Sequence, residues 1–230
     1  MRKNSIYNVY LCVALQMLLP GKTILIIACI VYASCQPSTN KAAAPRKAIS
    51  ISDSNKNYDY LLHKLETQPG NINYDSLGEI ISKISFNIKT NDLANFNDGK
   101  IPWIRIDSPQ IEIQNLMSKD ETVINKNRIA IIIDYPLTNT YVFELISPTG
   151  FTRTQLINEI SQQYYQLYDE EERTATIKTL PVEQRKMYNR NRTDGKYGIW
   201  GHDIGDLVLT EIIVYKTSNE MIFLTLEIES

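Results

Sequence analysis

The alternation of apolar and polar residues in the second half of the chain predicts a β-sheet. Residues 128–135 contain a continuous apolar run, which is typical of a central strand buried on both faces. In residues 221–229 apolar and polar side chains alternate, as in a strand with one buried face, and an antiparallel hairpin is expected to join this strand to 207–216. Three further short strands are predicted at 103–106, 111–116 and 141–146.

A single long helix is predicted to begin after Phe151. Thr152 is followed three residues later by Gln155, the pattern of a capping box, and Phe151 and Leu156 occupy the positions of a hydrophobic staple. The apolar residues that follow have the spacing of one helical face: Leu156, Ile157, Ile160, Tyr164, Leu167 and Tyr168. This is the clearest local signal in the chain.

Two shorter helices are predicted before the sheet. Residues 58–66 and 74–84 each carry apolar side chains at helical spacing, and a Thr-Gln-Pro-Gly breaker separates them. Strands on both sides of one long helix, without repeated βαβ alternation, indicate an α+β fold with a mainly antiparallel sheet and the helix on one face. The expected parts are a small helical segment at 58–100, which ends in an Asn- and Asp-rich loop, and an α+β domain at 101–230.

The N-terminal region has the features of an export signal followed by a tether. The apolar runs 6–19 and 23–33 are divided by Pro-Gly-Lys, and a lysine at the centre of a membrane helix costs about 2.5–3.5 kcal/mol, so one continuous transmembrane helix is disfavoured. The second run follows Lys22 and ends in small residues, as export signals do. Residues 36–57 are too poor in bulky apolar side chains to offset chain entropy, which predicts a disordered tether.

The sequence Tyr32-Ala33-Ser34-Cys35 resembles the lipobox of bacterial lipoproteins, although Tyr32 stands where an aliphatic residue is usual. A second match ends at Cys29, but Cys35 is favoured because a polar run follows it at once. The resemblance implies that 1–35 is a lipoprotein-type signal segment, that Cys35 is acylated, and that the protein is anchored to a membrane of the bacterial cell envelope. A cleaved secretory signal and an uncleaved anchor are the alternatives, and translation could start at Met1 or at Met17.

Composition excludes several classes of partner and chemistry. Lys and Arg number 24 against 26 Asp and Glu, and beyond residue 35 the balance is 21 against 26, which argues against binding to nucleic acid. All cysteines lie in the first 35 residues, so the folded part has no thiol for a disulfide, a metal site or a nucleophile. With His63 and His202 as the two histidines, a zinc site of the usual kind is not expected, and no metal or cofactor is predicted.

The richest stretch of polar chemistry is a loop at 189–207. Gly195, Gly198 and Gly201 lie three residues apart, a spacing that suits backbone with positive φ angles or backbone that passes close to another group, and that predicts an ordered loop. The candidate site residues in it are His202 and Asp203 as catalytic residues, and Arg190, Arg192, Asp194, Trp200 and Asp206 as ligand-binding residues.

Each candidate has a structural alternative. His202 could act as a general base with Asp194 or Asp206, or it could hold the loop backbone together with Asp203. The two arginines could bind a carboxylate or phosphate, or they could face water. Trp200 could stack on a ligand or fill the core. The acids at 169–172 could form a solvated, fraying helix end, or they could contact a cation or the arginines of the loop.

The segments 134–137, 150–153, 191–195 and 197–203 together resemble a family of uncharacterised proteins from bacteria and some eukaryotes. The last of them, Tyr-Gly-Ile-Trp-Gly-His-Asp, is the most specific, and the resemblance covers about the C-terminal half. It implies a fold and no activity.

Two classes of function remain. The sequence contains no serine-hydrolase elbow, phosphate-binding Gly-Lys-Ser/Thr loop or Rossmann glycine pattern. The preferred hypothesis is a noncatalytic envelope lipoprotein whose C-terminal domain binds a protein or small ligand through the loop 189–207, because no nucleophile or metal set is evident. The alternative is a hydrolase-like enzyme that uses His202 with a nearby aspartate.

Overall fold

A computed structural model describes residues 10–19, 22–31 and 72–230. The chain divides into two compact units, Met1–Ser50 and Ile51–Ser230. In the first unit, β1 (Tyr10–Leu19) pairs antiparallel with β2 (Lys22–Val31). Among the helices in the described ranges, none has the length and apolar character to cross a membrane. Cys35, the tether and the segment 58–66 lie outside the described residues, so the signal, the lipidation and the first short helix stay predictions.

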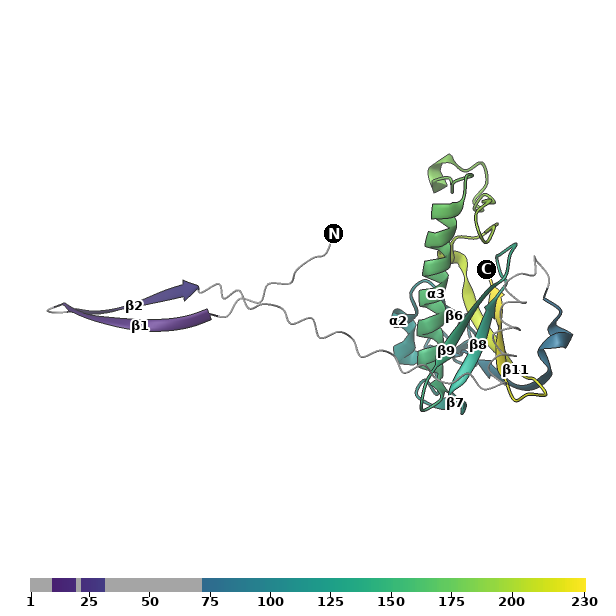
Figure 1. Ribbon diagram of the computed structural model, residues 1–230, viewed down its shortest axis with the longest axis horizontal. Coiled ribbons are helices and arrows are strands. Elements are labelled where there is room, and N and C mark those ends of the chain that lie inside the picture. The colour runs from purple at the N-terminus through teal and green to yellow at the C-terminus, as the bar shows by residue number, and fades with distance from the viewer. Residues whose placement is uncertain (1–9, 20–21, 32–71) are drawn as a thin grey trace. The chain divides into compact units, whose positions relative to one another are not determined.

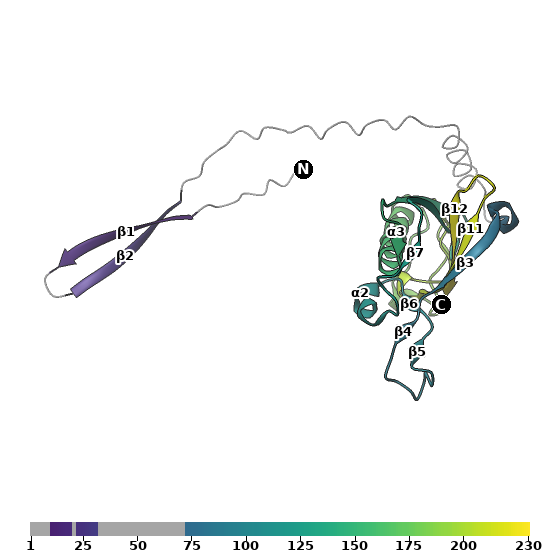
Figure 2. The same ribbon diagram turned by 90° about the horizontal axis from the view of Figure 1, so that it is seen from below.

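The second unit has the predicted α+β fold (Figures 1 and 2). Its six-stranded sheet has the order β3-β11-β12-β8-β9, and β6 also pairs with β11. All pairings in this sheet are antiparallel except that of β12 with β8. The strands are β3 (Glu79–Ser85), β6 (Ile104–Arg105), β8 (Arg128–Ile133), β9 (Tyr141–Ile146), β11 (Val208–Lys216) and β12 (Ile222–Glu229). Two small pairs lie beside it, β4 (Ile88–Lys89) with β5 (Lys100–Ile101), and β7 (Thr122–Ile124) with β10 (Phe151–Thr152).

The long helix α3 (Arg153–Thr174) covers one face of this sheet (Figures 1 and 2). Its predicted capping box is confirmed: the Gln155 amide donates to Thr152 Oγ1 at 3.2 Å, and the Thr152 amide donates to Gln155 Oε1 at 2.8 Å. The predicted apolar stripe faces the core, with all its members buried except Tyr168, which is partly buried.

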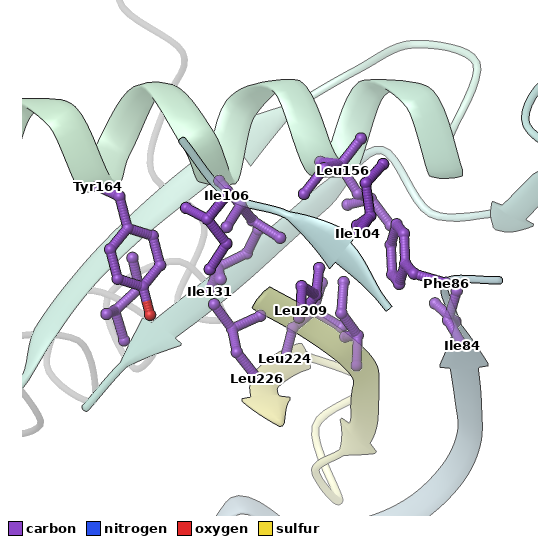
Figure 3. Packing of buried hydrophobic residues seen from close by; sticks show 14 of the residues in the cluster. Ile84, Phe86, Ile104, Ile106, Ile131, Leu156, Tyr164, Leu209, Leu224 and Leu226 are labelled. Atoms are coloured by element: carbon purple, nitrogen blue, oxygen red, sulfur yellow. The ribbon is translucent and has the colours of Figure 1, made fainter. Parts of the chain in front are cut away.

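The core forms where α3 meets the sheet (Figure 3). Leu156 and Tyr164 of α3 contribute to the same cluster as Ile131 of β8 and Leu224 of β12. β8 is buried on both faces, as predicted, because Ile129, Ile131 and Ile133 belong to this cluster while Ala130 and Ile132 belong to a second one. Full burial of one such aliphatic side chain contributes about 1.5–3 kcal/mol. β12 also lies inside the sheet, and its first five residues, 222–226, are all buried. The predicted alternation of buried and exposed side chains is therefore wrong for this part of the strand.

The predicted helix at 74–84 is wrong. The chain forms a short 3₁₀ turn, η1 (Tyr74–Leu77), and then continues as β3 at the sheet edge. Gly78 separates them with φ +106°, and a Cβ at this position would lie 2.3 Å from the Lys216 carbonyl oxygen. Pairing with β11 therefore outweighs the helical spacing of the isoleucines, and the sheet begins at residue 79 instead of 101.

The predicted strand at 111–116 is also wrong, because this stretch is helical: α2 (Pro109–Glu112) runs into η2 (Ile113–Asn115). Pro109 stands at the start of α2, where its fixed φ favours a helical first turn. The strand expected at 103–106 is reduced to the two residues of β6. The strand at 141–146 and the closing hairpin of β11 and β12 are confirmed.

Candidate functional site

The loop 189–207 lies at the C-terminal end of α3 (Figure 1). The chain reaches it from α3 through an excursion at 175–188 that contains η3 (Val182–Gln184), and leaves it through η4 (Ile204–Asp206) into β11. A bridge closes the loop, with the Arg190 amide donating to the Gly201 carbonyl at 3.1 Å. Gly198 and Gly201 have φ of +63° and +76°, the conformation that the glycine spacing predicts.

A buried carboxylate holds the inner part of this loop. Glu171 of α3 is fully buried, and it accepts hydrogen bonds from the backbone amides of Gly195 (2.8 Å), Tyr197 (2.7 Å) and Gly198 (3.1 Å). The hydroxyl of Thr193 donates to it as well, at 2.6 Å. Burial raises the pKa of Glu171, but these hydrogen bonds to its ionised form outweigh burial and hold the pKa below its ordinary value.

Space around this carboxylate is tight. A Cβ added at Gly195 would lie 2.7 Å from the Glu171 carboxylate, so glycine is required for this close approach. Sequence reasoning missed Glu171, although a signal existed: it lies four residues after Leu167 and seven after Tyr164, on the same buried face of the helix.

The other acids at the end of α3 also contact the loop. Glu170 pairs with Lys196 at 3.1 Å and accepts the Tyr197 hydroxyl at 2.6 Å. Glu172 lies 3.9 Å from Arg190. The prediction of a solvated, fraying end is therefore wrong for Glu170, Glu171 and Glu172. The alternative of contact with a cation of the loop is confirmed for Glu170 with Lys196 and for Glu172 with Arg190, whereas Glu171 binds the backbone and a hydroxyl of the loop instead.

Asp203 is held by two arginines. Its carboxylate contacts Arg185 at 2.5 and 3.2 Å and Arg190 at 3.4 Å. It also takes part in a capping box at η4, where Asp206 accepts from the Asp203 amide at 2.9 Å. Burial raises the pKa of Asp203, and the hydrogen bond and charge of Arg185, with the charge of Arg190, outweigh burial and lower it.

The two loop arginines differ in their surroundings. Arg190 is 9% exposed, and its guanidinium lies 5.1 Å from the centre of the Tyr168 ring, a cation–π distance. Its Nε is buried without a hydrogen-bond partner among the described residues. A water-facing role is thus wrong for Arg190, because Tyr168 and Asp203 draw it inward. Arg192 is exposed and donates to Thr138 Oγ1 at 3.0 Å.

His202 is partly exposed and lies beside two aromatic rings, 5.6 Å from Tyr135 and 6.2 Å from Trp200 between ring centres. Its Nε2 lies 3.4 Å from the Ser230 hydroxyl, and its carbonyl accepts the Tyr168 hydroxyl at 2.9 Å. Among the described residues no carboxylate is hydrogen-bonded to the imidazole.

The aspartates proposed as partners of His202 have other roles. Asp194 accepts from the backbone amides of Thr176 (2.8 Å) and Ile177 (2.7 Å), which ties the loop to the chain after α3. Asp206 caps η4 with Asp203. A catalytic role for His202 stays a prediction, without an oriented carboxylate in the described part of the chain.

Trp200 does not fill the core. Its side chain is 39% exposed, and its ring packs edge-to-face on Tyr135 with 5.3 Å between centres. The core position beneath the loop is taken by Tyr197 and Ile199, which are buried. Further large apolar side chains are exposed in the preceding excursion: Ile177, Leu180, Val182, Met187 and Tyr188.

No family model matches the chain, and no curated protein or solved structure matches it either. The resemblance carried by 197–203 therefore stays a prediction. In residues 72–230 and the two N-terminal strands, no group of three or more His, Cys, Asp or Glu side chains is placed to hold a metal ion.

Proposed function

We propose that the C-terminal domain is a noncatalytic docking domain that binds another protein through one surface, the docking surface, made of the excursion 175–188 and the loop 189–207. The observation that carries this proposal is the exposure of six large apolar side chains there, between 39% and 78%: Ile177, Leu180, Val182, Met187, Tyr188 and Trp200. Scattered exposed apolar residues are ordinary, but a concentration of them in one segment marks an interaction site. Aromatic residues and methionine are also enriched in protein interfaces.

The docking surface is held rigidly from beneath. Glu171 binds the loop backbone, Asp203 joins Arg185 and Arg190, and Asp194 joins the loop to the excursion. A surface already held in its binding conformation loses less entropy when a partner binds. A rigid surface can be complementary in shape to another rigid surface, which favours a protein partner over a lipid bilayer.

Charge indicates the chemistry of the partner. The docking surface, residues 175–207, contains six Lys or Arg and four Asp or Glu, a formal net charge of +2, whereas the whole chain has −2. Three of the six are paired, Arg185 and Arg190 with Asp203 and Lys196 with Glu170, but Lys178, Lys186 and Arg192 are exposed. We expect a partner with an apolar pocket for Trp200 and an acidic rim, because complementary charge steers association.

The N-terminal sequence supports a cellular setting for this binding function. The lipobox-like residues ending at Cys35 support acylation and attachment to a membrane of the bacterial envelope, with 36–57 as the tether. The hydrolase-like alternative is less favoured, because Asp194, Asp203 and Asp206 are engaged elsewhere and the described residues supply no carboxylate to the His202 ring.

The proposal is tested by photo-crosslinking in cells that produce the full chain. A benzophenone amino acid placed at Tyr188, which is 78% exposed, should give one discrete protein adduct, and the same probe at Ile146 of β9, which is 74% exposed, should not. Trp200→Ser should reduce the Tyr188 adduct by about tenfold or more if Trp200 is a main contact. Adducts of equal yield at both positions, or crosslinks from Tyr188 to lipid alone, would refute protein docking.

A further inference from the structure

A second candidate site lies near the opposite end of α3, where the helix begins. A surface pocket of about 290 Å³ is lined by Lys83, Ser85, Asn87, Lys100, Met117, Ser118 and Arg153. These residues come from β3, the link between β3 and β4, β5, the chain around 117–118 and the first position of α3. Three of the seven are cationic and none is acidic.

The cations of this pocket are unequally neutralised. Lys83 pairs with Glu211 at 2.9 Å, but its side chain is 58% exposed, and such surface pairs are weak in water. Arg153 is fixed: it donates to the carbonyls of Ser85 (3.2 Å) and Ser118 (3.3 Å) and pairs with Glu121 at 2.8 Å. Lys100 has no ion pair with any residue in the described ranges.

Strand pairing places a second lysine beside Lys100. In the pair β4–β5, Lys89 stands directly opposite Lys100. Like charges at opposed positions destabilise a pair of strands, because their side chains leave the same face close together. A bound anion would relieve this repulsion, because neither Lys89 nor Lys100 has an ion pair within the described part of the chain.

From this juxtaposition we propose that the pocket binds a phosphoryl group, either free phosphate or a phosphate monoester. Lys83, Lys100 and Arg153 supply positive charge to the lining, and Asn87 and Ser118 supply an amide and a hydroxyl donor. A phosphoryl group carries close to two negative charges and three acceptor oxygens at neutral pH, which matches this set better than a single carboxylate. The pocket volume is near the lower end of the range for small-molecule sites.

A neighbouring pocket limits where the phosphate lies. It shares Lys83, Ser85 and Asn87 with the first, but it is also lined by Glu211 and Glu227, which repel an anion. The phosphoryl group therefore belongs on the Lys100 and Arg153 side. α3 has 22 residues, so it separates this pocket from the docking surface by roughly 33 Å, and the two proposals stand independently.

The test is a titration of the full chain with inorganic phosphate, followed by backbone amide NMR shifts. Phosphate at millimolar concentration should shift the amides of Ser85, Asn87 and Ser118. Lys100→Ala should weaken binding by about tenfold, and Lys100→Arg should restore most of it. Lys126→Ala is the matched control, because Lys126 is an exposed lysine paired with Glu220 and away from the pocket.

Further arms separate selective binding from charge screening and identify the source of the phosphoryl group. Acetate and chloride at equal ionic strength should leave the three amides unshifted. Vesicles with phosphatidic acid, compared with phosphatidylcholine alone, report whether a lipid headgroup is the better ligand. The proposal is overturned if phosphate leaves Ser85, Asn87 and Ser118 unshifted, if Lys100→Ala binds as the unaltered chain does, or if all anions act alike, which would mean an adventitious ion only.

Discussion

The two ends of α3, the long helix in Figure 1, differ in which partners their charged side chains have. At the C-terminal end, the carboxylates of Glu170, Glu171 and Glu172 all contact the loop, and the docking surface exposes large apolar side chains. At the N-terminal end, Lys100 and Arg153 line a hollow without an acid in its wall. One end of the helix therefore uses its charges to hold the loop, whereas at the other end Lys100 has no ion pair in the described part of the chain, which is where we propose that an anion binds.

The most damaging change at the C-terminal end should be Glu171→Ala. It removes one buried acceptor that serves four donors, and each buried donor left unsatisfied costs about 1–3 kcal/mol. We expect the free energy of unfolding to fall by about 3 kcal/mol or more in urea denaturation. Asp169→Ala is the matched control, because Asp169 is an exposed acid of the same helix end and its ion pair with Arg173 is exposed too. A loss below about 1 kcal/mol for Glu171→Ala would contradict its role as the anchor of the loop.

Asp203→Ala should have the next largest effect. It leaves Arg185 and Arg190 without their shared carboxylate, and the side chains of both arginines are only 7% exposed. Removing one partner of a largely buried ion pair is strongly destabilising, so we expect a loss of about 2–3 kcal/mol. His202→Ala should cost less than about 1 kcal/mol, since its ring is partly exposed and its hydrogen bond to Ser230 is long. Equal losses of stability for the two variants, measured by thermal unfolding, would show that this distinction is wrong.

At the N-terminal end, Thr152→Ala should cost about 1 kcal/mol through loss of the N-cap. The Gln155 amide would lose its acceptor, while the rest of α3 keeps its packing on the sheet. The measurement is the urea midpoint, with Thr154→Ala compared beside it because its hydroxyl bonds Lys119 and does not cap the helix. An unchanged midpoint for Thr152→Ala would mean that the cap does not limit stability.

The smallest expected effect is the loss of stability at acidic pH. Burial raises the pKa of Glu171 and the hydrogen bonds lower it by more, so the folded pKa lies below the ordinary value of 4.5. A lowered folded pKa means that the stabilisation is complete above about pH 4.5 and is lost as the pH falls through the folded pKa. We therefore expect the unfolding free energy of the unaltered chain to decline in this acidic range, and the decline to be shallower in Glu171→Gln. Parallel pH profiles would rule out Glu171 as a source of acid sensitivity.

Much of the fold could be predicted because its strongest signals are local. The capping box at Thr152 and the apolar run of β8 each specify an element within a few residues. The segments 74–84 and 111–116 could not be predicted correctly in the same way. The first is largely a strand because β11 is available to pair with it, and the second is helical with Pro109 at its start, although its apolar residues suggest a strand.

The ordered loop at 189–207 was predicted more accurately than the contacts of its residues. The glycine spacing indicates an ordered loop, and the loop is closed by hydrogen bonds. The roles of Arg190 and Asp203 depend on Arg185 and Tyr168, which are distant in sequence from the signature at 197–203. An acid that follows apolar residues at helical spacing is normally taken to mark the end of the buried face, so Glu171 was overlooked. In the structure Glu171 continues the buried face of α3.

The contacts of Glu171 also carry a consequence for the order of folding. They join residues only 22 to 27 positions apart, whereas the side-chain bond of Ser85 to Glu211, between β3 and β11, spans 126 positions. Closing a short loop costs less entropy than closing a long one, and contacts that are near in sequence form sooner. We expect the loop to assemble on the end of α3 before β3 joins the sheet, so that amides at 195–198 gain protection from hydrogen exchange earlier in refolding than those of β3.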